Sequence, residues 1–195
     1  MEITLDQIKS LRVKTGVSMQ MCKRALEETA GNEEKAVELL RKKGEAKAAE
    51  RGDRATGEGY IGSYIHSNGK IGVLVQLGCE TDFVALSTDF QALAKDIAMH
   101  VAGLCPVYVG PEDVPAEAIE KEKEIWRAQL AQEGKPAAMH DKIMEGKEKK
   151  FREEVSLMKQ AFVKNPDITI EKLISDAVLK LGENIRVVRF TRYSF

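Results

Sequence analysis

Three helix start-and-stop signals follow one another within the first 44 residues, and they restrict the fold more than any other feature of the chain. Each signal has a Ser, Thr or Asn where a helix begins and a Gly where it ends: Thr4 to Gly16, Ser18 to Gly31 and Asn32 to Gly44. Gln7 completes a capping box with Thr4, because its side chain can reach back to the backbone of the cap. The segment predicts a three-helix module of roughly 40 residues.

Residues 45–57 differ in composition from the module before them. Their sequence, EAKAAERGDRATG, contains almost no large apolar side chain. A segment of this kind forms a polar helix or a linker, and it contributes little to a core. We therefore expect two domains, a helical module with its linker at 1–54 and a second domain at 55–195.

The second domain begins with a hairpin signal. Two apolar segments, 60–65 and 70–78, flank HSNG, in which Asn68-Gly69 is a strong hairpin signal. Alternate positions of the second segment carry the large aliphatic side chains, which are Ile71, Val73, Val75 and Leu77. This alternation predicts an antiparallel strand with one buried face.

The rest of the chain reads mainly as helices. Ser87 or Thr88 caps a helix whose apolar residues share one side, namely Phe90, Leu93, Ala94, Ile97 and Val101. After a Pro-punctuated loop we expect charged helices at 116–132 and 137–154, a loop at 163–168, a helix from Thr169 to Gly182 and a last strand near 185–195. These elements predict an α+β fold in which a small antiparallel sheet is packed with helices.

The stretch CETDFVA, residues 79–85, contains an unusual turn residue. Turns are usually built from Gly, Asn, Ser or Asp, yet Phe83 stands here between Asp82 and Val84. A ring in such a turn either folds back into the core or is offered to a partner. The residues alone leave both readings open.

Two short motifs resemble enzyme signatures but lack the required context. Residues 57–62 match G-x-G-x-x-G, but they open a strand instead of a helix, so a glycine-rich domain boundary is the better interpretation than phosphate binding. Asp82-Phe83 is followed by Val84 and not by the Gly of a kinase metal motif, and the chain contains no phosphate-loop or kinase catalytic-loop sequence.

The remaining reactive residue types also favour structural roles. Cys79 lies beside acidic residues, which raise a thiol pKa and disfavour a nucleophile. His100 shares a helix face with Ile97 and Val101, which indicates a half-buried structural histidine. The Cys, His and acidic residues show no metal-ligand spacing, so we expect no metal site and no cofactor. A catalytic set assembled only by the tertiary fold stays open as an alternative.

Charge and composition narrow the cellular setting. The formal net charge of −1 argues against a general nucleic-acid binder. The longest apolar runs fall well short of the roughly 18 residues needed to cross a bilayer. The three cysteines are isolated and odd in number, which is typical of a reducing compartment. We therefore expect a cytoplasmic protein that binds neither membrane nor nucleic acid directly.

Two longer signatures carry a family resemblance. LRVKTGVSMQMCKRALEETAG, residues 11–31, is similar to the pattern L-R-x-x-T-G-x-x-M-x-x-C-K-x-A-L, and CETDFVA contains T-D-F-V. The similarity continues through FQALAKDIAMHVA and the C-terminal ENIRVVRF, with a departure at Gln20, where many members carry a second Met. The chain resembles a short form of the bacterial elongation factor Ts family.

The resemblance implies a function and its residues. Members of this family are guanine-nucleotide exchange factors for the GTPase elongation factor Tu and have no catalytic chemistry of their own. Their ubiquitin-associated-like helical module docks on the partner, and Arg12 and Met19 match its contact positions. Thr81, Asp82, Phe83 and Val84 match the motif whose Phe inserts between partner helices near the Mg²⁺ site, while its Asp perturbs the groups that hold the ion.

Assembly as a homodimer is expected as well. A sheet of two or three strands has exposed edges, and the last strand carries apolar residues on both faces, which are Val187, Val188, Phe190, Tyr193 and Phe195. Short members of the family pair in this way, which implies that His66 contacts the GTPase from the second subunit. The rival readings are an interaction scaffold with a different partner and an enzyme with a site invisible to motifs.

Overall fold

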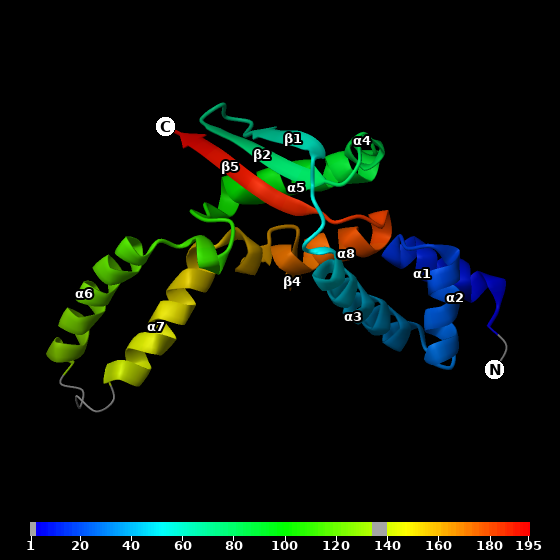
Figure 1. The fold of residues 1–195 in the computed structure, drawn as a ribbon, viewed down its shortest axis with the longest axis horizontal. Coiled ribbons are helices and arrows are strands. Elements are labelled where there is room, and N and C mark those ends of the chain that lie inside the picture. Colours follow the sequence, from blue (N-terminus) through cyan, green and yellow to red (C-terminus); the bar gives the residue numbers. More distant parts are fainter. Residues whose placement is uncertain (1–2, 134–139) are drawn as a thin grey trace.

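The computed structural model describes residues 3–133 and 140–195. A three-stranded sheet packed with helices forms the centre, and two helical elements extend from it in different directions (Figure 1). One of them is the N-terminal module of α1 (Leu5–Thr15), α2 (Met19–Glu28) and α3 (Glu33–Arg51). The other is a hairpin of α6 (Ala116–Gln132) and α7 (His140–Val155). The mixed arrangement confirms the predicted α+β class.

The three predicted helix starts of the N-terminal module are confirmed in atomic detail. The Gln7 N–H donates to the Thr4 hydroxyl at 3.3 Å, and the Thr4 N–H donates to the Gln7 side chain at 3.0 Å. The side chains of Ser18 and Asn32 cap α2 and α3 by accepting the Met21 and Lys35 N–H groups. The three helices enclose a small core of their own, called here the N-terminal core: Ile8, Leu11, Val17, Cys22, Ala25, Leu26, Ala36 and Leu40.

The expected stop at Gly44 is wrong, because α3 continues to Arg51. Gly44 is buried where α3 crosses α8 (Ile170–Leu181). A Cβ atom at this position would lie 3.2 Å from the Ser175 carbonyl oxygen and 3.6 Å from the Leu179 Cβ. The glycine therefore permits two helices to approach closely, and the polar segment after it forms the last turns of α3.

The sheet has the order β1-β2-β5, with all neighbours antiparallel. Its strands are β1 (Glu58–Ile65), β2 (Ile71–Cys79) and β5 (Arg186–Ser194). Val75 pairs with Gly62 on one side and with Phe190 on the other, and a bulge interrupts the second ladder between Gln76 and Leu77. The hairpin and the late strand are thus as predicted, and β1 and β5 form the two edges.

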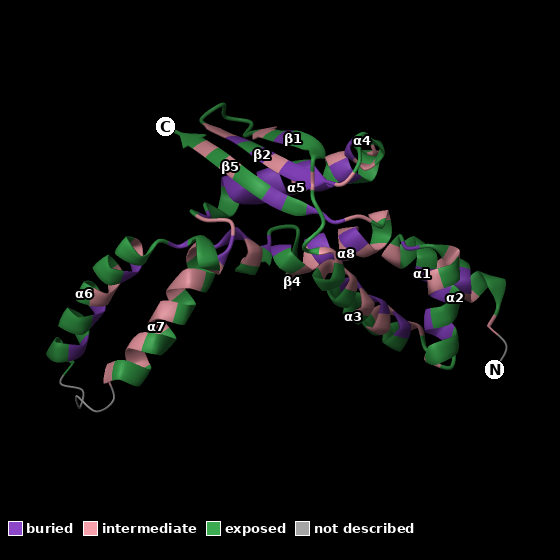
Figure 2. Ribbon diagram, in the orientation of Figure 1, coloured by how far each residue is buried: buried purple, intermediate pink, exposed green. Residues whose placement is uncertain are grey.

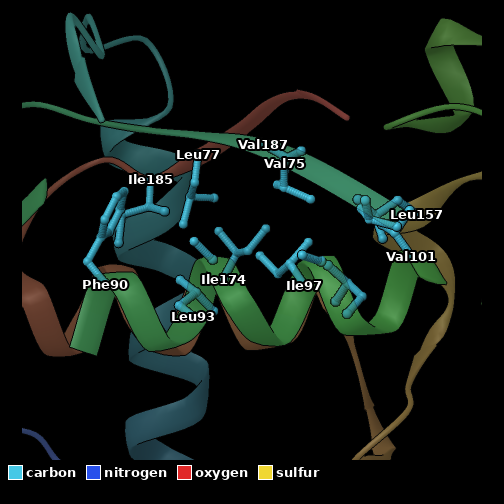
Figure 3. Close-up of a cluster of buried hydrophobic side chains, with 14 of the residues drawn as sticks. Val75, Leu77, Phe90, Leu93, Ile97, Val101, Leu157, Ile174, Ile185 and Val187 are labelled. Atoms are coloured by element: carbon cyan, nitrogen blue, oxygen red, sulfur yellow. The ribbon is translucent and has the colours of Figure 1, made fainter. Parts of the chain in front are cut away.

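The main core lies between one face of the sheet and the helices α5 (Thr88–Leu104) and α8. Figure 3 shows the side chains of β2 and β5 meeting those of α5, with Ile174 of α8 and Leu157 completing the cluster. Ser87, and not Thr88, caps α5, because its hydroxyl accepts the Phe90 N–H at 3.3 Å. The predicted faces of β2 and α5 are both buried, with Ile71 half-buried at the strand's start.

The expected loop at 163–168 is partly a strand. Residues Ala161–Phe162 form β3 and Asn165–Thr169 form β4, which pair as a short antiparallel hairpin before α8 begins. His100 contacts this hairpin and the residue before it through its two ring nitrogens. The Val163 N–H, between β3 and β4, donates to the His100 Nδ1 at 3.2 Å, and the His100 Nε2 lies 3.0 Å from the Gln160 side-chain oxygen. His100 is therefore fully buried, not half-buried, and its burial lowers its pKa.

Few side chains are buried in the hairpin of α6 and α7. Trp126 packs edge-on against Phe151, with ring centroids 5.9 Å apart. At its base the Arg152 guanidinium donates to the Pro111 carbonyl at 3.0 Å, next to the short turn η1 (Pro111–Asp113). The predicted first helix is confirmed, whereas the start of the second helix at residue 137 lies outside the described residues.

The glycines of the 57–62 motif generate a stability prediction. A Cβ on Gly62 would lie 2.8 Å from the Ala94 backbone, whereas one on Gly57 would meet nothing within 4 Å. Replacing Gly62 by Ala should force β1 and α5 apart and lower the free energy of unfolding by about 1–3 kcal/mol. Gly57→Ala is the matched control and should stay within about 0.5 kcal/mol.

Urea denaturation of both variants provides the measurement. Equal stability of Gly62→Ala and the unmodified chain would show that the helix can shift at no cost, and the close approach would then have no structural role.

Candidate functional site

The turn after β2 is built so that its first half faces outward and its second half faces inward. Thr81 caps the four-residue helix α4 (Asp82–Ala85), and its hydroxyl accepts the Val84 N–H at 3.5 Å. Ala85 is buried and Val84 packs against the main core. Asp82 and Phe83 are exposed, and Phe83 has 83% of its surface open to solvent. The reading of Phe83 as a core residue is therefore wrong.

Leu86 adds a second apolar side chain to this surface. It is the residue after α4, and 73% of its surface is exposed. Residues three positions apart share a face of a helical turn, so Leu86 and Phe83 form an apolar pair. We call this pair the α4 prong. In the sequence Leu86 is an apolar residue three positions after Phe83, and it lies outside the T-D-F-V motif, which ends at Val84.

The polar groups around the turn favour a binding surface that presents Phe83 over a catalytic or metal site. The Asp82 carboxylate accepts the Phe83 N–H at 2.9 Å. Burial raises the pKa of the Cys79 thiol to about 11, with a further contribution from the Glu183 charge, so this thiol stays protonated near neutral pH. Among the described residues, no group of three or more His, Cys, Asp or Glu side chains is arranged to hold a metal ion.

Arg12 and Met19 lie on either side of the connection between α1 and α2, at a different corner of the molecule. Arg12 is exposed near the end of α1, while Met19 begins α2 and is half-buried against the N-terminal core. Val13, beside Arg12, is 86% exposed and was not singled out from the sequence. The corner rests on α8, since a Cβ atom at Gly16 would lie 2.9 Å from the Lys180 side chain.

His66 occupies a third position, in the turn between β1 and β2. Its side chain is exposed, and Nδ1 lies 3.1 Å from the Tyr64 hydroxyl. The β2 strand begins beside His66 and ends beside Thr81. The structure therefore brings Thr81, Asp82, Phe83 and Val84 together but places His66 at the opposite end of β2 within one chain.

The outer face of the sheet, turned away from α5, carries a further apolar surface. Its exposed residues come from all three strands and are Ile61, Ile65, Leu74, Val188 and Tyr193. Leu74 is the exposed residue of β2, whereas most residues of β5 are exposed (Figure 2). We call this surface the outer sheet face. Phe190 belongs to the inner face instead, where it packs against the main core.

The fold and these surfaces define a protein that presents exposed apolar side chains on a frame of helices and strands. Comparison with known sequences identifies the family. The sequence model of the family described as Elongation factor TS matches residues 7–195. The chain is 54% identical to elongation factor Ts of Syntrophus aciditrophicus over 193 residues, which cover 99% of this chain and 96% of the relative.

Two further relatives give the same result. Elongation factor Ts of Carboxydothermus hydrogenoformans is 52% identical, with 98% of this chain and 88% of the relative covered. That of Fervidobacterium nodosum is 53% identical, with 98% of both chains covered. The chain belongs to the elongation factor Ts family, and therefore to the elongation factors of protein biosynthesis. In the described parts of the chain, each helix is too short or too polar to cross a membrane.

Proposed function

We propose that the chain is a guanine-nucleotide exchange factor that binds elongation factor Tu in its GDP-bound form and promotes GDP release. The observation that carries this proposal is the 83% exposed Phe83 on a short helix that Val84 and Ala85 anchor to the main core. Exposing a ring in this way forgoes about 2–3 kcal/mol of burial. A partner that buries the ring recovers this free energy. The chain supplies no catalytic chemistry of its own.

The proposed mechanism uses the turn as a wedge. Phe83 inserts between helices of the GTPase near its Mg²⁺ site, and Leu86 enlarges the apolar contact. The Asp82 carboxylate lies next to the ring and disturbs the groups that hold the ion. Thr81 and Val84 keep the helical turn in place, the first by capping it and the second by packing against the core.

A wedge alone is too weak for this task. Speeding nucleotide release by a factor of 10³–10⁵ requires roughly 4–7 kcal/mol, which exceeds what burial of one ring contributes. The factor must also bind the nucleotide-free state more tightly than the loaded state, since equal affinity shifts no equilibrium. We assign the additional binding energy to the N-terminal module, which docks through Arg12 and Met19.

The module and the domain division are part of the same proposal. We treat 1–54 as a ubiquitin-associated-like docking module and 55–195 as the core and dimerisation domain. The separate N-terminal core supports this division, although α3 also packs on α8. The exchange factor works in the cytoplasm, without direct contact to nucleic acid or membrane.

Removal of the Phe83 ring tests the wedge. Phe83→Ala should slow GDP release from elongation factor Tu tenfold or more, because about 1.4 kcal/mol or more of coupling is lost. The rate is measured with fluorescent GDP by stopped flow. Val107→Ala, which shortens another exposed apolar side chain, is the control. Normal exchange by a folded Phe83→Ala variant would contradict the wedge.

Charge reversal at the docking corner tests the module. Arg12→Glu should weaken binding of elongation factor Tu about fivefold or more, since a contact of an exposed cation becomes repulsive. Titration calorimetry gives the affinity, and Lys35→Glu on the exposed side of α3 is the control. Equal affinities for both variants would exclude Arg12 from the interface.

We further propose a non-covalent homodimer through the outer sheet face. Pairing two such faces about a twofold axis buries the apolar residues of both and places His66 of one subunit near the partner GTPase of the other. A charge at Phe190 is unsuitable as a test of this dimer, because this ring packs against the main core on the inner face.

Leu74→Glu is the better test of the dimer, since Leu74 lies on the central strand and is 49% exposed. Light scattering at micromolar concentration should give about twice the chain mass for the unmodified protein and about half of that value for the variant. Leu104→Glu, at the end of α5, controls for added charge. A monomeric unmodified chain at high concentration would refute the dimer.

A further inference from the structure

Helix α4 cannot hold its own orientation. It has four residues, and an isolated helical turn fixes many backbone angles for very few hydrogen bonds. The direction in which Phe83 points therefore depends on what holds the two ends of the helix. Val84 and Ala85 hold one side by packing against the main core. The other side begins at Thr81, where the contacts are polar.

The carboxylate of Glu183 makes three of these contacts. The N–H groups of Glu80 and Thr81 both donate to its Oε2 at 3.0 Å, and the Thr81 hydroxyl donates to its Oε1 at 2.5 Å. Hydrogen bonds to a charged acceptor are shorter and stronger than those between neutral groups. A residue 102 positions beyond Thr81 thus binds the backbone just ahead of the α4 prong.

The end of α8 delivers Glu183 to this place. Gly182, with φ of 82°, ends the helix and turns the chain toward the end of β2. The next residue, Asn184, returns the contact, because its N–H donates to the Glu80 Oε1 at 2.6 Å. The two segments therefore accept hydrogen bonds from each other, and the joint does not depend on a single contact.

The same joint extends to the N-terminal module. The buried Asn184 side chain donates to the Arg54 carbonyl at 2.8 Å and to the Gly52 carbonyl at 3.3 Å, directly after α3. The Arg54 guanidinium also lies 3.6 Å from the Glu80 carboxylate. One set of polar contacts thus connects the end of α3, the end of α8 and the turn that carries Phe83.

We propose that Glu183 is a positioning residue for the exchange site, whose carboxylate fixes the turn ahead of α4 so that Asp82 and Phe83 are presented in one orientation before the partner binds. The inference rests on the proposed function. A side chain that is already ordered loses less entropy on binding. Because the module docks separately, loss of the carboxylate should lower the maximal rate of GDP release and change the half-saturating concentration little.

Hydrogen exchange of the free chain, followed by NMR, tests the clamp itself. In Glu183→Ala the Glu80 and Thr81 amides should exchange about tenfold faster or more, since their acceptor is removed. Glu183→Gln should keep most of the protection, because its amide oxygen can accept both N–H groups. Glu183→Asp, which retains the charge but is too short to reach, should behave like the Ala variant and carries the test if that variant does not fold. Glu171→Ala, in the first turn of α8, is the control.

Fluorescent-GDP release at varied factor concentration tests the positioning. Glu183→Ala should reduce the maximal rate about fivefold, with the half-saturating concentration within about twofold, and Glu183→Gln should restore most of the rate. Unchanged amide protection, or faster amide exchange with an unchanged maximal rate, would overturn the inference. An unmodified chain that fails to accelerate release would instead refute the proposed function, while the partner-free amide measurement would still decide whether Glu183 holds the turn.

Discussion

Packing of α8 on two cores is the interaction on which the rest of the structure depends. Ile170, Ile174 and Val178 are buried in the main core, while Leu179 packs against the N-terminal core. Full burial of one such side chain contributes about 1.5–3 kcal/mol, so the contact with the main core is strong on the scale of a domain's stability, and the half-buried Leu179 adds a smaller contact on the other side. A single helix therefore fixes the sheet relative to the N-terminal module. Its C-terminal end then reaches both the α1–α2 corner, through Lys180, and the α4 turn, through Glu183.

This arrangement separates the parts that provide stability from the parts that meet a partner. The buried residues of β2 and α5 form the frame, and the short helix α4 adds only Val84 and Ala85 to it. Phe83 and Leu86 can remain exposed because the frame does not need them. In a chain whose surface is otherwise rich in charge, such an apolar pair on a fixed turn is the kind of feature that marks an interaction site.

The outer sheet face also exposes apolar side chains that the main core does not need, and it does so over a larger area. One face of the three-stranded sheet is covered by α5, and the other leaves apolar residues of each strand exposed. Burying both faces of a small sheet requires a layer on each side. In the described parts of the chain, no helix covers the outer sheet face. His66 and Phe83 stand at opposite ends of β2, so a partner that contacts both must do so through two copies of the chain or across the full length of the strand.

Local patterns in the sequence determined the local elements. Thr4, Ser18 and Asn32 cap helices because a short polar side chain satisfies free backbone N–H groups wherever it precedes a helix. The alternation in β2 predicted its buried face, and Asn68-Gly69 predicted the turn. The family signatures, and not periodicity, identified Thr81 to Val84 and the corner at Arg12 and Met19.

Only the tertiary structure decided what residues distant in the chain do to one another. Gly44 looks the same in the sequence whether it ends a helix or permits a close crossing, and the position of α8 distinguishes the two. The Val163 N–H, between β3 and β4, donates to His100 across 63 positions, and Glu183 binds the Thr81 turn across 102 positions. Phe190 and Val188 read alike, yet a bulge assigns them to different surroundings. Hydrogen bonds and close packing depend on which segments meet in space, and a local sequence pattern carries no information about that meeting.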